Sequence, residues 1–583
     1  MNEVWNLDPL YKGFDDPAFA ADFSALKDKI AAFAAFTENL ASCQPLTGLR
    51  EGIRHQEEFM RYANRIGQYA SLRQSANTRD TAASSNMGKF LGVISDMAVP
   101  RAAFKAWASA LPDLMELVRG DEDLKDYEFM FSNMSDSSRY LLPGRGEEIM
   151  ARMELSGGNA WSDLQSYLTS TVKVNYNGGV TNLSTIRNLA YDSDPAVRKA
   201  AYEAELACYE SIKDSVAFAL NSIKLETISD CKLRGYESPL SRTLKYSDMS
   251  QATLDAMFGA MDEFLPKFWQ YMKAKAKALG HENGLPWYEL FAPMGSVSQN
   301  YTTEYAREYL LKQFSTFDQE LTDMVAKAFD EAWIDFYPRD GKAGGAFCAG
   351  VDVLGESRIL TNFDGMFGDI VTLAHELGHA FHNWCLKEQR PMNRHYSMPV
   401  AETASTFNEC IVMNAAIAAA EKEEKLALIE NQLQDVNQII CDIYSRFCFE
   451  ASVFAKREEE FMDADTLCGL MLDAQKKCYG DGLDHNVLHP YMWVCKGHYY
   501  GPTFYNFPYA FGGLFARGLY AQYQKEGAAF VPKYKRLLQA TAVSTAEDTA
   551  KVAGIDLTDK DFWRSALQSV ADQIDLFCEL VEE

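Results

Sequence analysis

Apolar residues at intervals of three and four run through most of this chain, a pattern typical of helices that bury one face. Residues 425–447 show it clearly, with apolar side chains at Leu426, Ile429, Leu433, Val436, Ile440, Ile443 and Phe447. Residues 194–230 repeat the pattern, and Asp194 and Pro195 suit the cap and first turn of a helix. Strand-like segments are confined to residues 336–366, where glycine-rich turns separate short apolar runs. The sequence therefore predicts a mainly α fold with one small β-sheet.

Glycine residues interrupt the helical pattern near residues 157–159 and 177–180, and such interruptions commonly separate structural units. With 583 residues, of which 47% are hydrophobic, the chain is long enough for more than one packed unit. We therefore expect an N-terminal helical lobe over residues 1–195 and a second region over residues 196–583, with the two lobes interleaved.

Charge and cysteine usage argue against several classes of protein. A net charge of −26 disfavours nucleic acids and anionic membranes as partners. The N-terminal sequence lacks the apolar run of a secretory signal. The chain also contains no uninterrupted apolar stretch of about 18 residues, which is the length that would predict a membrane span. Twelve cysteines, none of them in a CxxC pair, are typical of a reducing compartment. We expect a cytoplasmic protein, and the sequence leaves its oligomeric state open.

The stretch LAHELGHAFHNW, residues 373–384, contains the pattern HExxH. Its apolar residues recur at helical spacing and predict a helix over residues 370–384. Residues four apart differ by about 40° around a helix, so His375 and His379 project side by side, as two ligands of one metal ion must. Glu376 lies about 100° round the helix, where it could reach a metal-bound water without being a ligand. The pattern predicts a zinc site with Glu376 as the general base.

A zinc site of this kind needs a third protein ligand and an open fourth position. HExxH should arise by chance in under roughly 2% of chains of this composition, which favours a metal site. Accidental matches still occur across many proteins, so the alternative is a core helix with two ordinary histidines. Glu402 begins the next predicted helix among small and apolar residues, which favour its burial and make it the candidate ligand. Glu409 lies on the same helix face and could orient a zinc-bound imidazole. The alternative for Glu402 is an exposed carboxylate at a helix start.

Three separated motifs give this chain a family resemblance. HELGHAFH at residues 375–382, VAETASTFNE at 400–409 and HYYGPTFYNFPYAFGGL at 498–514 together resemble the oligoendopeptidase F family of zinc peptidases, which is related to thimet oligopeptidase. Shorter stretches, GKAGGAFC at 341–348 and RILTNFDG at 358–365, extend the resemblance over most of the chain. It implies one zinc ion held by His375, His379 and Glu402, with Glu376 as the base. It also implies a helical bowl or clamshell with a deep central channel that admits short peptides and excludes folded proteins.

The third motif carries a histidine and several tyrosines that could donate hydrogen bonds. Peptide hydrolysis builds negative charge on the scissile carbonyl oxygen, and donors aimed at that oxygen stabilise the transition state. In the family that the chain resembles, a histidine and later tyrosines of this region have that role, which implies His498, Tyr505 and Tyr509 here. Phe507 departs from the pattern, because relatives often carry a tyrosine at its position, and this leaves open which tyrosine acts. The alternative for these rings is aromatic packing between two parts of the fold.

The resemblance implies two further sets of residues. An extended peptide can pair its backbone with an exposed strand edge, and in the family the region of Gly345, Ala346 and Phe347 supplies such an edge. His382 follows His379 by one helical turn and matches a family position that supports the metal site.

The sequence thus predicts a metalloendopeptidase that hydrolyses internal bonds of short peptides with a zinc-activated water, and places its catalytic region within residues 196–583. One alternative is a zinc carboxypeptidase or dipeptidase on a similar helical fold, which would need a cationic residue for the substrate's free carboxylate. A non-catalytic peptide-binding protein is the other alternative, and the presence of all four candidate metal-site residues argues against it.

Overall fold

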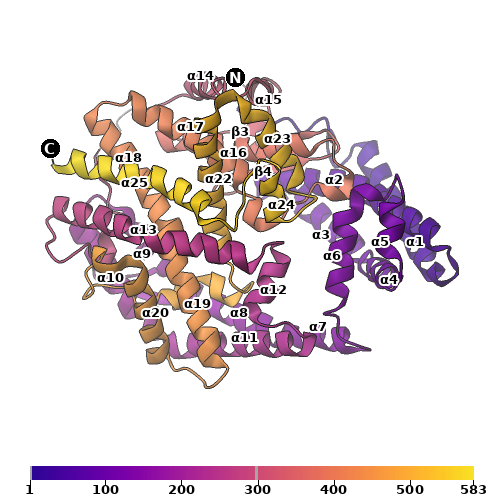
Figure 1. Ribbon diagram of the computed structural model, residues 1–583, viewed down its shortest axis with the longest axis horizontal. Helices are drawn as coiled ribbons and strands as arrows, with labels where there is room; N and C mark the ends of the chain where they lie inside the picture. Colours follow the sequence, from indigo (N-terminus) through magenta and orange to yellow (C-terminus); the bar gives the residue numbers. More distant parts are fainter. Residues whose placement is uncertain (1–2, 296–299, 583) are drawn as a thin grey trace.

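The computed structural model describes residues 3–295 and 300–582, and it is mainly α-helical (Figure 1). No described helix is long and apolar enough to cross a membrane. Within the described residues, three hydrophobic clusters form the core. Each cluster gathers a different group of helices, and together they define how the candidate site residues are positioned.

The first cluster lies within the N-terminal group of helices, drawn in indigo and purple in Figure 1. Its buried residues run from Trp5 to Phe131 and are joined by Val351 and Leu360 from a distant part of the chain. The helices of this group are α1 (Pro17–Glu38), α2 (Pro45–Ala76), α3 (Thr81–Ser95), α4 (Ala98–Ser109), α5 (Leu114–Arg119) and α6 (Glu128–Ser138).

The second cluster combines two parts of the chain that are far apart in sequence. Residues 172–223 pack there against residues 449–500, so segments on both sides of the predicted lobe boundary at residue 195 share a core with the C-terminal half. The boundary itself stays a prediction. The helices that contribute to this cluster are α8 (Gly158–Thr171), α9 (Leu183–Asn188), α10 (Pro195–Tyr209), α11 (Lys213–Arg234), α19 (Ile443–Arg457), α20 (Ala464–Tyr479) and α21 (Met492–Cys495). Two further helices lie beside it: α7 (Gly146–Ser156) contacts α8, and α12 (Pro239–Tyr246) contacts α11.

The third and largest cluster surrounds the HExxH helix. In Figure 1 the helices α16, α17 and α22 lie together in the upper middle of the view, and α25 runs from the C-terminus at the left toward α22, which it contacts. The helices of this cluster are α13 (Gln251–Ala278), α14 (Thr303–Phe314), α15 (Gln319–Asp330), α16 (Phe367–Leu386), α17 (Thr403–Ala419), α18 (Lys422–Asn437), α22 (Phe507–Glu526), α23 (Val531–Ala540), α24 (Ala546–Lys551) and α25 (Lys560–Glu582).

Two helical predictions differ in detail from the structure. Residues 194–230 form two helices, α10 and α11, and the hydroxyl of Ser211 donates to the Cys208 carbonyl at the break, 2.8 Å away. Such side-chain bonds to the backbone compete with helix continuation. Residues 425–447 do form one continuous helical rod, but a π-helical segment, Gln438–Asp442, joins α18 to α19. The inserted residue of a π segment changes which side chains face a given neighbour.

The predicted small sheet is present beside the HExxH helix. Strand β5 (Glu356–Leu360) lies in the middle, parallel to β3 (Ile334–Asp335) and antiparallel to β4 (Phe347–Val351). Its side chains alternate between two cores, since Ile359 belongs to the core around α16 and Leu360 to the N-terminal core. The sheet therefore separates these two cores and belongs to both.

A second sheet corrects the expectation of only one. Strands β1 (Lys173–Tyr176) and β2 (Gly179–Asn182) form an antiparallel hairpin. The turn residues Asn177 and Gly178 have φ angles of 48° and 75°, and an Asn-Gly pair is the typical sequence signal for such a turn. The prediction missed the hairpin because its strands are short and largely polar, although the interruption near residues 177–180 coincides with it.

Candidate metal centre and active site

The HExxH helix is α16, and a carboxylate fixes its first turn. The side chain of Asp369 accepts hydrogen bonds from the backbone N–H groups of Asp364, Gly365 and Met366, at 2.9 to 3.1 Å. A carboxylate at the N-terminus of a helix accepts hydrogen bonds from free N–H groups, and its negative charge interacts favourably with the positive end of the helix dipole. The helix then brings His375 and His379 to one face, as the four-residue spacing predicts.

Three candidate metal ligands converge on one point. The Nε2 atoms of His375 and His379 lie 3.2 Å apart. The Glu402 Oε2 atom lies 3.3 Å from the first of these nitrogens and 3.4 Å from the second. These three residues are also the only group of histidine, cysteine and carboxylate side chains with metal-binding spacing found in residues 3–295 and 300–582.

This donor set fits a tetrahedral zinc ion. Donors bound at about 2.0–2.2 Å in a tetrahedron lie roughly 3.3–3.6 Å from one another, and the three observed separations are 3.2, 3.3 and 3.4 Å. Two imidazoles and one carboxylate are also the protein ligands of many catalytic zinc sites, which leave a fourth position open. The geometry can therefore hold a metal ion, and a triangle of three donors leaves room for a further ligand.

Two glycines and a serine hold Glu402 in place. A Cβ atom on Gly378 of α16 would lie 2.4 Å from the Ala404 carbonyl oxygen, so only glycine lets α17 approach this closely. Gly512 of α22 packs on the other side, where a Cβ would lie 3.1 Å from the Cβ of Glu402. The Ser405 hydroxyl donates to Glu402 Oε2 at 2.7 Å. The carboxylate is thus oriented toward the histidines by close helix packing.

The side chain of Glu409 contacts His375 from behind. Its Oε1 lies 2.5 Å from His375 Nδ1. A carboxylate can only accept here, so Nδ1 carries the hydrogen and the Nε2 lone pair is free for a metal. Burial lowers the pKa of His375, but the hydrogen bonds to Glu402 and Glu409 outweigh burial and raise the pKa to about 10, so Nε2 holds a cation strongly, whether a proton or a metal ion. Burial would raise the pKa of Glu402, but the imidazoles of His375 and His379 hold it well below its usual range. A cation is therefore strongly favoured at this position.

Glu376 lies beside the ligand group and is only 5% exposed. Its Oε2 atom is buried and has no hydrogen-bond partner among the described residues. Burial raises the pKa of Glu376, although the neighbouring His375 and His379 oppose this effect. A buried carboxylate oxygen with no partner and a raised pKa is a stronger base than an exposed carboxylate and is free to accept a proton.

His498 lies on a short 3-10 helix, Gly497–Tyr500, and Arg446 fixes its tautomer. The Arg446 guanidinium lies 3.3 Å from His498 Nδ1 and can only donate. Nδ1 must therefore accept, and Nε2 carries the hydrogen that can be donated elsewhere. Burial and the charges of Arg446 and Lys496 lower the pKa of His498, which keeps the ring neutral. Arg446 is itself held by Asp442.

The rings of His498, Tyr505 and Tyr509 form a triangle. Their centroids are 5.8 to 5.9 Å apart in all three pairs. Tyr509 lies three residues before Gly512 on α22, the glycine that packs against Glu402. The charge of Glu402 also acts on Tyr509, whose pKa burial raises to about 12. The structure thus brings this predicted group together on the Glu402 side of the metal centre.

A strained turn presents Tyr505, and a buried ion pair holds it. Phe504 has a φ of 52°, which is unusual for a bulky residue. The Glu450 carboxylate accepts from the Phe504 N–H at 3.1 Å and from the Asn506 side-chain amide at 2.8 Å. It also accepts from Lys224 Nζ at 2.7 Å, and both charged side chains are almost fully buried. Several hydrogen bonds to one buried carboxylate therefore fix the backbone on both sides of Tyr505.

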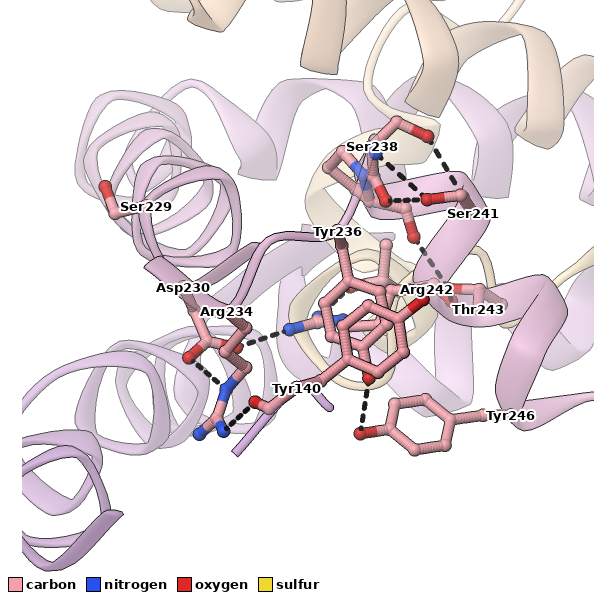
Figure 2. A network of polar contacts seen from close by, with 12 residues as sticks. Tyr140, Ser229, Asp230, Arg234, Tyr236, Ser238, Ser241, Arg242, Thr243 and Tyr246 are labelled. Atoms are coloured by element: carbon pink, nitrogen blue, oxygen red, sulfur yellow. Dashed lines mark hydrogen bonds and ion pairs between the residues drawn. The ribbon is translucent and has the colours of Figure 1, made fainter. Parts of the chain in front are cut away.

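A second polar network contacts the same turn from outside (Figure 2). The Asp230 carboxylate accepts from Arg234 and from Arg242, at 2.7 and 2.8 Å. Arg242 and Thr243 of α12 then donate to the side-chain and backbone oxygens of Thr503, at 3.3 and 3.0 Å. Figure 2 also shows the ring of Tyr140 stacked on Tyr236, with centroids 3.9 Å apart. This network connects α11 and α12 to the turn that carries Tyr505.

The remaining predicted residues lie at two other positions. The His382 side chain is fully buried, its Nε2 lies 2.8 Å from the Thr541 hydroxyl, and its ring stacks on Tyr396. Among the described residues it makes no hydrogen bond to a ligand residue, and burial lowers its pKa to about 3. Gly345 and Ala346 lead into β4, which is an edge strand of its sheet. Phe347 is the first residue of β4, and its ring packs near Trp5.

Several residues of the site escaped the sequence analysis. Ser405 could have been found three positions after Glu402, where a helix-start serine commonly bonds a nearby acceptor. Gly378 could have been found from its position within HELGH, since a glycine inside a helix usually has a packing reason. No local pattern distinguishes Arg446 or Glu450 from other charged residues of long helices, because their partners come from other parts of the chain.

Two cavities lie next to the site. The metal-side cavity has a volume of about 370 Å³ and is lined by His375, Glu409, Asp435 and Arg517 among other residues. The aromatic cavity has a volume of about 320 Å³ and is lined by rings that include Tyr191, Trp287 and Phe291. Asp435 lines both cavities. They are therefore adjacent, and the deep central channel stays a prediction.

Comparison with known proteins gives matches over the whole chain. Residues 188–569 match the family model described as Peptidase family M3, and residues 100–173 match the one described as Oligopeptidase F. Oligopeptidase PepF of Bacillus subtilis is 24% identical over 99% of this chain and 87% of its own length. Group B oligopeptidase PepB of Streptococcus agalactiae is 24% identical over 79% of each chain.

Solved structures show the same fold. The crystal structure of oligoendopeptidase-F from Enterococcus faecium superimposes with a TM-score of 0.70 at 17% identity, covering 97% of this chain and 99% of that chain. A candidate peptidase from Chlamydophila abortus superimposes with a TM-score of 0.87 at 18% identity, covering 99% of this chain and 98% of that chain.

Proposed function

Since this chain belongs to peptidase family M3 and is a metalloendopeptidase acting on oligopeptides, we propose that it works with one zinc ion held by His375, His379 and Glu402. The mutual separations of the three donor atoms, 3.2 to 3.4 Å, carry this proposal. When bound, zinc lowers the pKa of a coordinated water to about 7 and polarises the scissile carbonyl.

Glu376 is the general base of the proposed reaction. Its unpartnered Oε2 is the proton acceptor, and burial, by raising the pKa of this carboxyl, makes it a stronger base than an exposed carboxylate. After the attack of water on the peptide carbonyl carbon, the same oxygen gives the proton to the nitrogen of the leaving amine. Glu409 supports the reaction by holding His375 in the tautomer whose Nε2 can bind the metal.

His498 and the two tyrosines stabilise the oxygen on which negative charge develops. Arg446 directs the His498 hydrogen to Nε2, which is then a neutral donor. Tyr509 keeps its phenolic hydrogen over the whole neutral range, because burial raises its pKa to about 12. A single fixed donor of this kind is worth up to about 10³-fold in acyl-transfer enzymes. Tyr505 is the second candidate donor, and its position depends on the turn that Glu450 holds.

The substrate binds as an extended peptide. The free edge of β4, with Gly345, Ala346 and Phe347 at its start, is available to pair with a peptide backbone beside α16. Cavities of about 320 and 370 Å³ accommodate a few side chains and exclude a folded domain. This supports short, unstructured peptides as substrates. The cytoplasmic location and the supporting role of His382 stay predictions.

Metal analysis combined with a series of peptide lengths tests the proposal. Glu376→Gln keeps the size of the side chain and removes its basicity, so zinc should stay at one ion per chain while the rate falls about 10²- to 10⁴-fold. Peptides of about 5 to 30 residues, with products identified by mass, show where the chain cuts. Internal cuts in short peptides only would support the proposal. Absence of zinc, or a fully active Glu376→Gln, would refute it.

The product masses also decide between this activity and the exopeptidase alternative. A carboxypeptidase or dipeptidase would shorten peptides stepwise from one end, whereas an endopeptidase releases internal fragments. Arg517 lines the metal-side cavity and is a candidate anchor for a free carboxylate, but only 8% of it is exposed. The observations therefore favour endopeptidase activity.

A further inference from the structure

Asp435 occupies a position that the proposed chemistry does not use. It lies near the end of α18 and lines both the metal-side cavity and the aromatic cavity. The side chain is exposed to these cavities, yet protein surrounds it closely enough that burial raises its pKa to about 6. An ionisable group in such a position faces whatever passes from one cavity to the other.

The π-helical segment after Asp435 turns further polar side chains toward the aromatic cavity. Gln438 begins this segment and Asp442 ends it, and both line the cavity together with Asp435. π segments are frequent at functional sites, and the extra residue changes the direction of side chains. The wall of the aromatic cavity thus carries three polar residues from a single helical rod.

The charges around Asp435 are mostly engaged with one another. Asp442 binds Arg446, Arg198 binds Glu289, and Arg187 binds Glu205. Arg517 shares the metal-side cavity with Asp435, but it is only 8% exposed, and its nearest polar partner is the sulfur of Cys410 at 3.9 Å. By contrast, the Asp435 carboxylate has no hydrogen-bond or ion-pair partner in the parts of the chain that the structure describes. Among the described charged residues that line these cavities, which include Lys496 in the aromatic cavity, Asp435 is the one that lines both.

We propose that the Asp435 carboxylate binds an ammonium group of the peptide substrate, which is either its free N-terminus or a lysine side chain. This inference rests on the proposed peptidase function and names a substrate class for it. Carboxylates form strong charge-assisted hydrogen bonds with ammonium groups. The rings of Tyr191 and Phe291, 4.9 Å apart, line the aromatic cavity and offer faces that attract cations.

Matched peptides test this binding site. Each peptide is prepared with a free or an acetylated N-terminus, and with lysine or uncharged norleucine at one internal position. The parent protein and Asp435→Asn are compared by kcat/KM for all four forms. We expect the parent to prefer one of the ammonium-bearing forms about tenfold, and Asp435→Asn to lose that preference. The N-terminal and lysine comparisons separate the two sources of the ammonium group.

Two further variants sharpen the result. Asp435→Lys should reverse the preference, because a cation in this position repels an ammonium group. Glu423→Gln is the matched control, since it removes an exposed carboxylate from the same helix away from both cavities, and it should keep the parent's preference.

The acetylated norleucine peptide keeps this proposal separate from the proposed function. Cleavage of that neutral peptide by the parent protein supports the peptidase function whatever Asp435 does. If the neutral peptide is cut and Asp435→Asn changes no preference, the ammonium site is refuted. If no peptide is cut by the parent, the proposed function fails first.

Discussion

The metal-ligand helices α16 and α17 and the segment 497–509 form two sides of the candidate active site, and different interactions fix them. On the metal side, His375 and His379 are placed by the period of one helix, and Glu402 by close packing at Gly378. On the other side, His498 and Tyr505 lie on a 3-10 helix and a strained turn. Distant residues such as Arg446 and Glu450 hold these positions.

This difference indicates how each side should respond to substitution. A helix keeps its ligands in register even when single packing contacts are lost, so metal binding on this side should weaken only when a ligand is removed or the helices themselves are moved apart. The segment 497–509 depends on individual hydrogen bonds from other elements, so single substitutions far from the substrate should be enough to disturb it. The following predictions test this contrast in order of decreasing effect.

The largest effect is expected when the hydrogen-bond donor His498 is removed from the segment 497–509. His498→Ala should lower kcat about 10²- to 10³-fold, because a neutral donor to the developing oxyanion is lost. Bound zinc should stay at one ion per chain, since no hydrogen bond joins His498 to a ligand residue in residues 3–295 and 300–582. His485→Ala, at an exposed loop histidine, is the control and should be fully active. Full activity of His498→Ala would exclude this residue from the reaction.

A smaller effect should follow when the metal helices are forced apart. The added methyl group of Gly378→Ala would meet the Ala404 carbonyl oxygen, so α17 and Glu402 must shift. Overpacking of this kind costs about 1–3 kcal/mol, and we expect zinc affinity to fall about 10- to 100-fold. Zinc titration against a chelator measures this. Gly469→Ala is the control, because its Cβ would meet no atom within 4 Å. Unchanged zinc affinity in Gly378→Ala would show that the contact does not position Glu402.

Loss of the carboxylate that holds the Tyr505 turn should lower kcat about tenfold with KM and zinc content unchanged. Glu450→Gln also leaves Lys224 buried without its partner, which should lower the free energy of unfolding by about 3–5 kcal/mol. The double variant Lys224→Met, Glu450→Gln removes the unpaired charge and should recover much of the stability. If kcat recovers with stability, Glu450 has only a structural role. If kcat stays low, its role is to position the turn.

Removal of single hydroxyl groups should identify which tyrosine acts. Tyr509→Phe should lower kcat more than Tyr505→Phe does, because Tyr509 lies on the face of α22 that packs against Glu402. We expect a loss of about tenfold for the residue that donates and less than about threefold for the other. Equal and small losses in both variants would support aromatic packing as the role of the pair.

The smallest effect concerns Asp435, which lines both the metal-side cavity and the aromatic cavity. Burial and the charge of Glu409 raise the pKa of Asp435 to about 6, and Arg517 opposes this. The carboxylate is ionised above that pH and protonated below it, so the preference for an ammonium-bearing peptide should decline as pH falls through about 6. The ratio of kcat/KM values for lysine and norleucine peptides measures the preference at each pH. A ratio that does not change in this range, or that changes equally in Asp435→Asn, would contradict the assignment.

The metal-ligand helices and the segment 497–509 also differ in how far the sequence alone predicts them. The helix of residues 370–384, the mainly α fold and the small sheet beside it were predicted correctly, because periodicity and turn residues act over short stretches of sequence. The three donors His375, His379 and Glu402 could be predicted because helical spacing places the first two and a following helix presents the third. Their proximity in the structure agrees with that reasoning.

The segment 497–509 could be proposed as part of the site only from the family resemblance. Nothing local to His498 indicates that Arg446 faces its Nδ1, and the strain at Phe504 depends on Glu450 and Lys224 from α19 and α11. The break between α10 and α11 and the second sheet were missed for a related reason. In both places a single hydrogen bond or a two-residue turn outweighs the periodicity of the surrounding sequence.

The shared position of the small sheet has a consequence for how the molecule unfolds. Alternate residues of β5 enter two different cores, Ile359 that of the metal helices and Leu360 that of the N-terminal helices. Neither core can open without exposing one face of the same strand, so the two should melt as one cooperative unit. A metal bound more than 200 residues away in sequence from much of the N-terminal helical group should therefore protect the backbone amides of that group against hydrogen exchange.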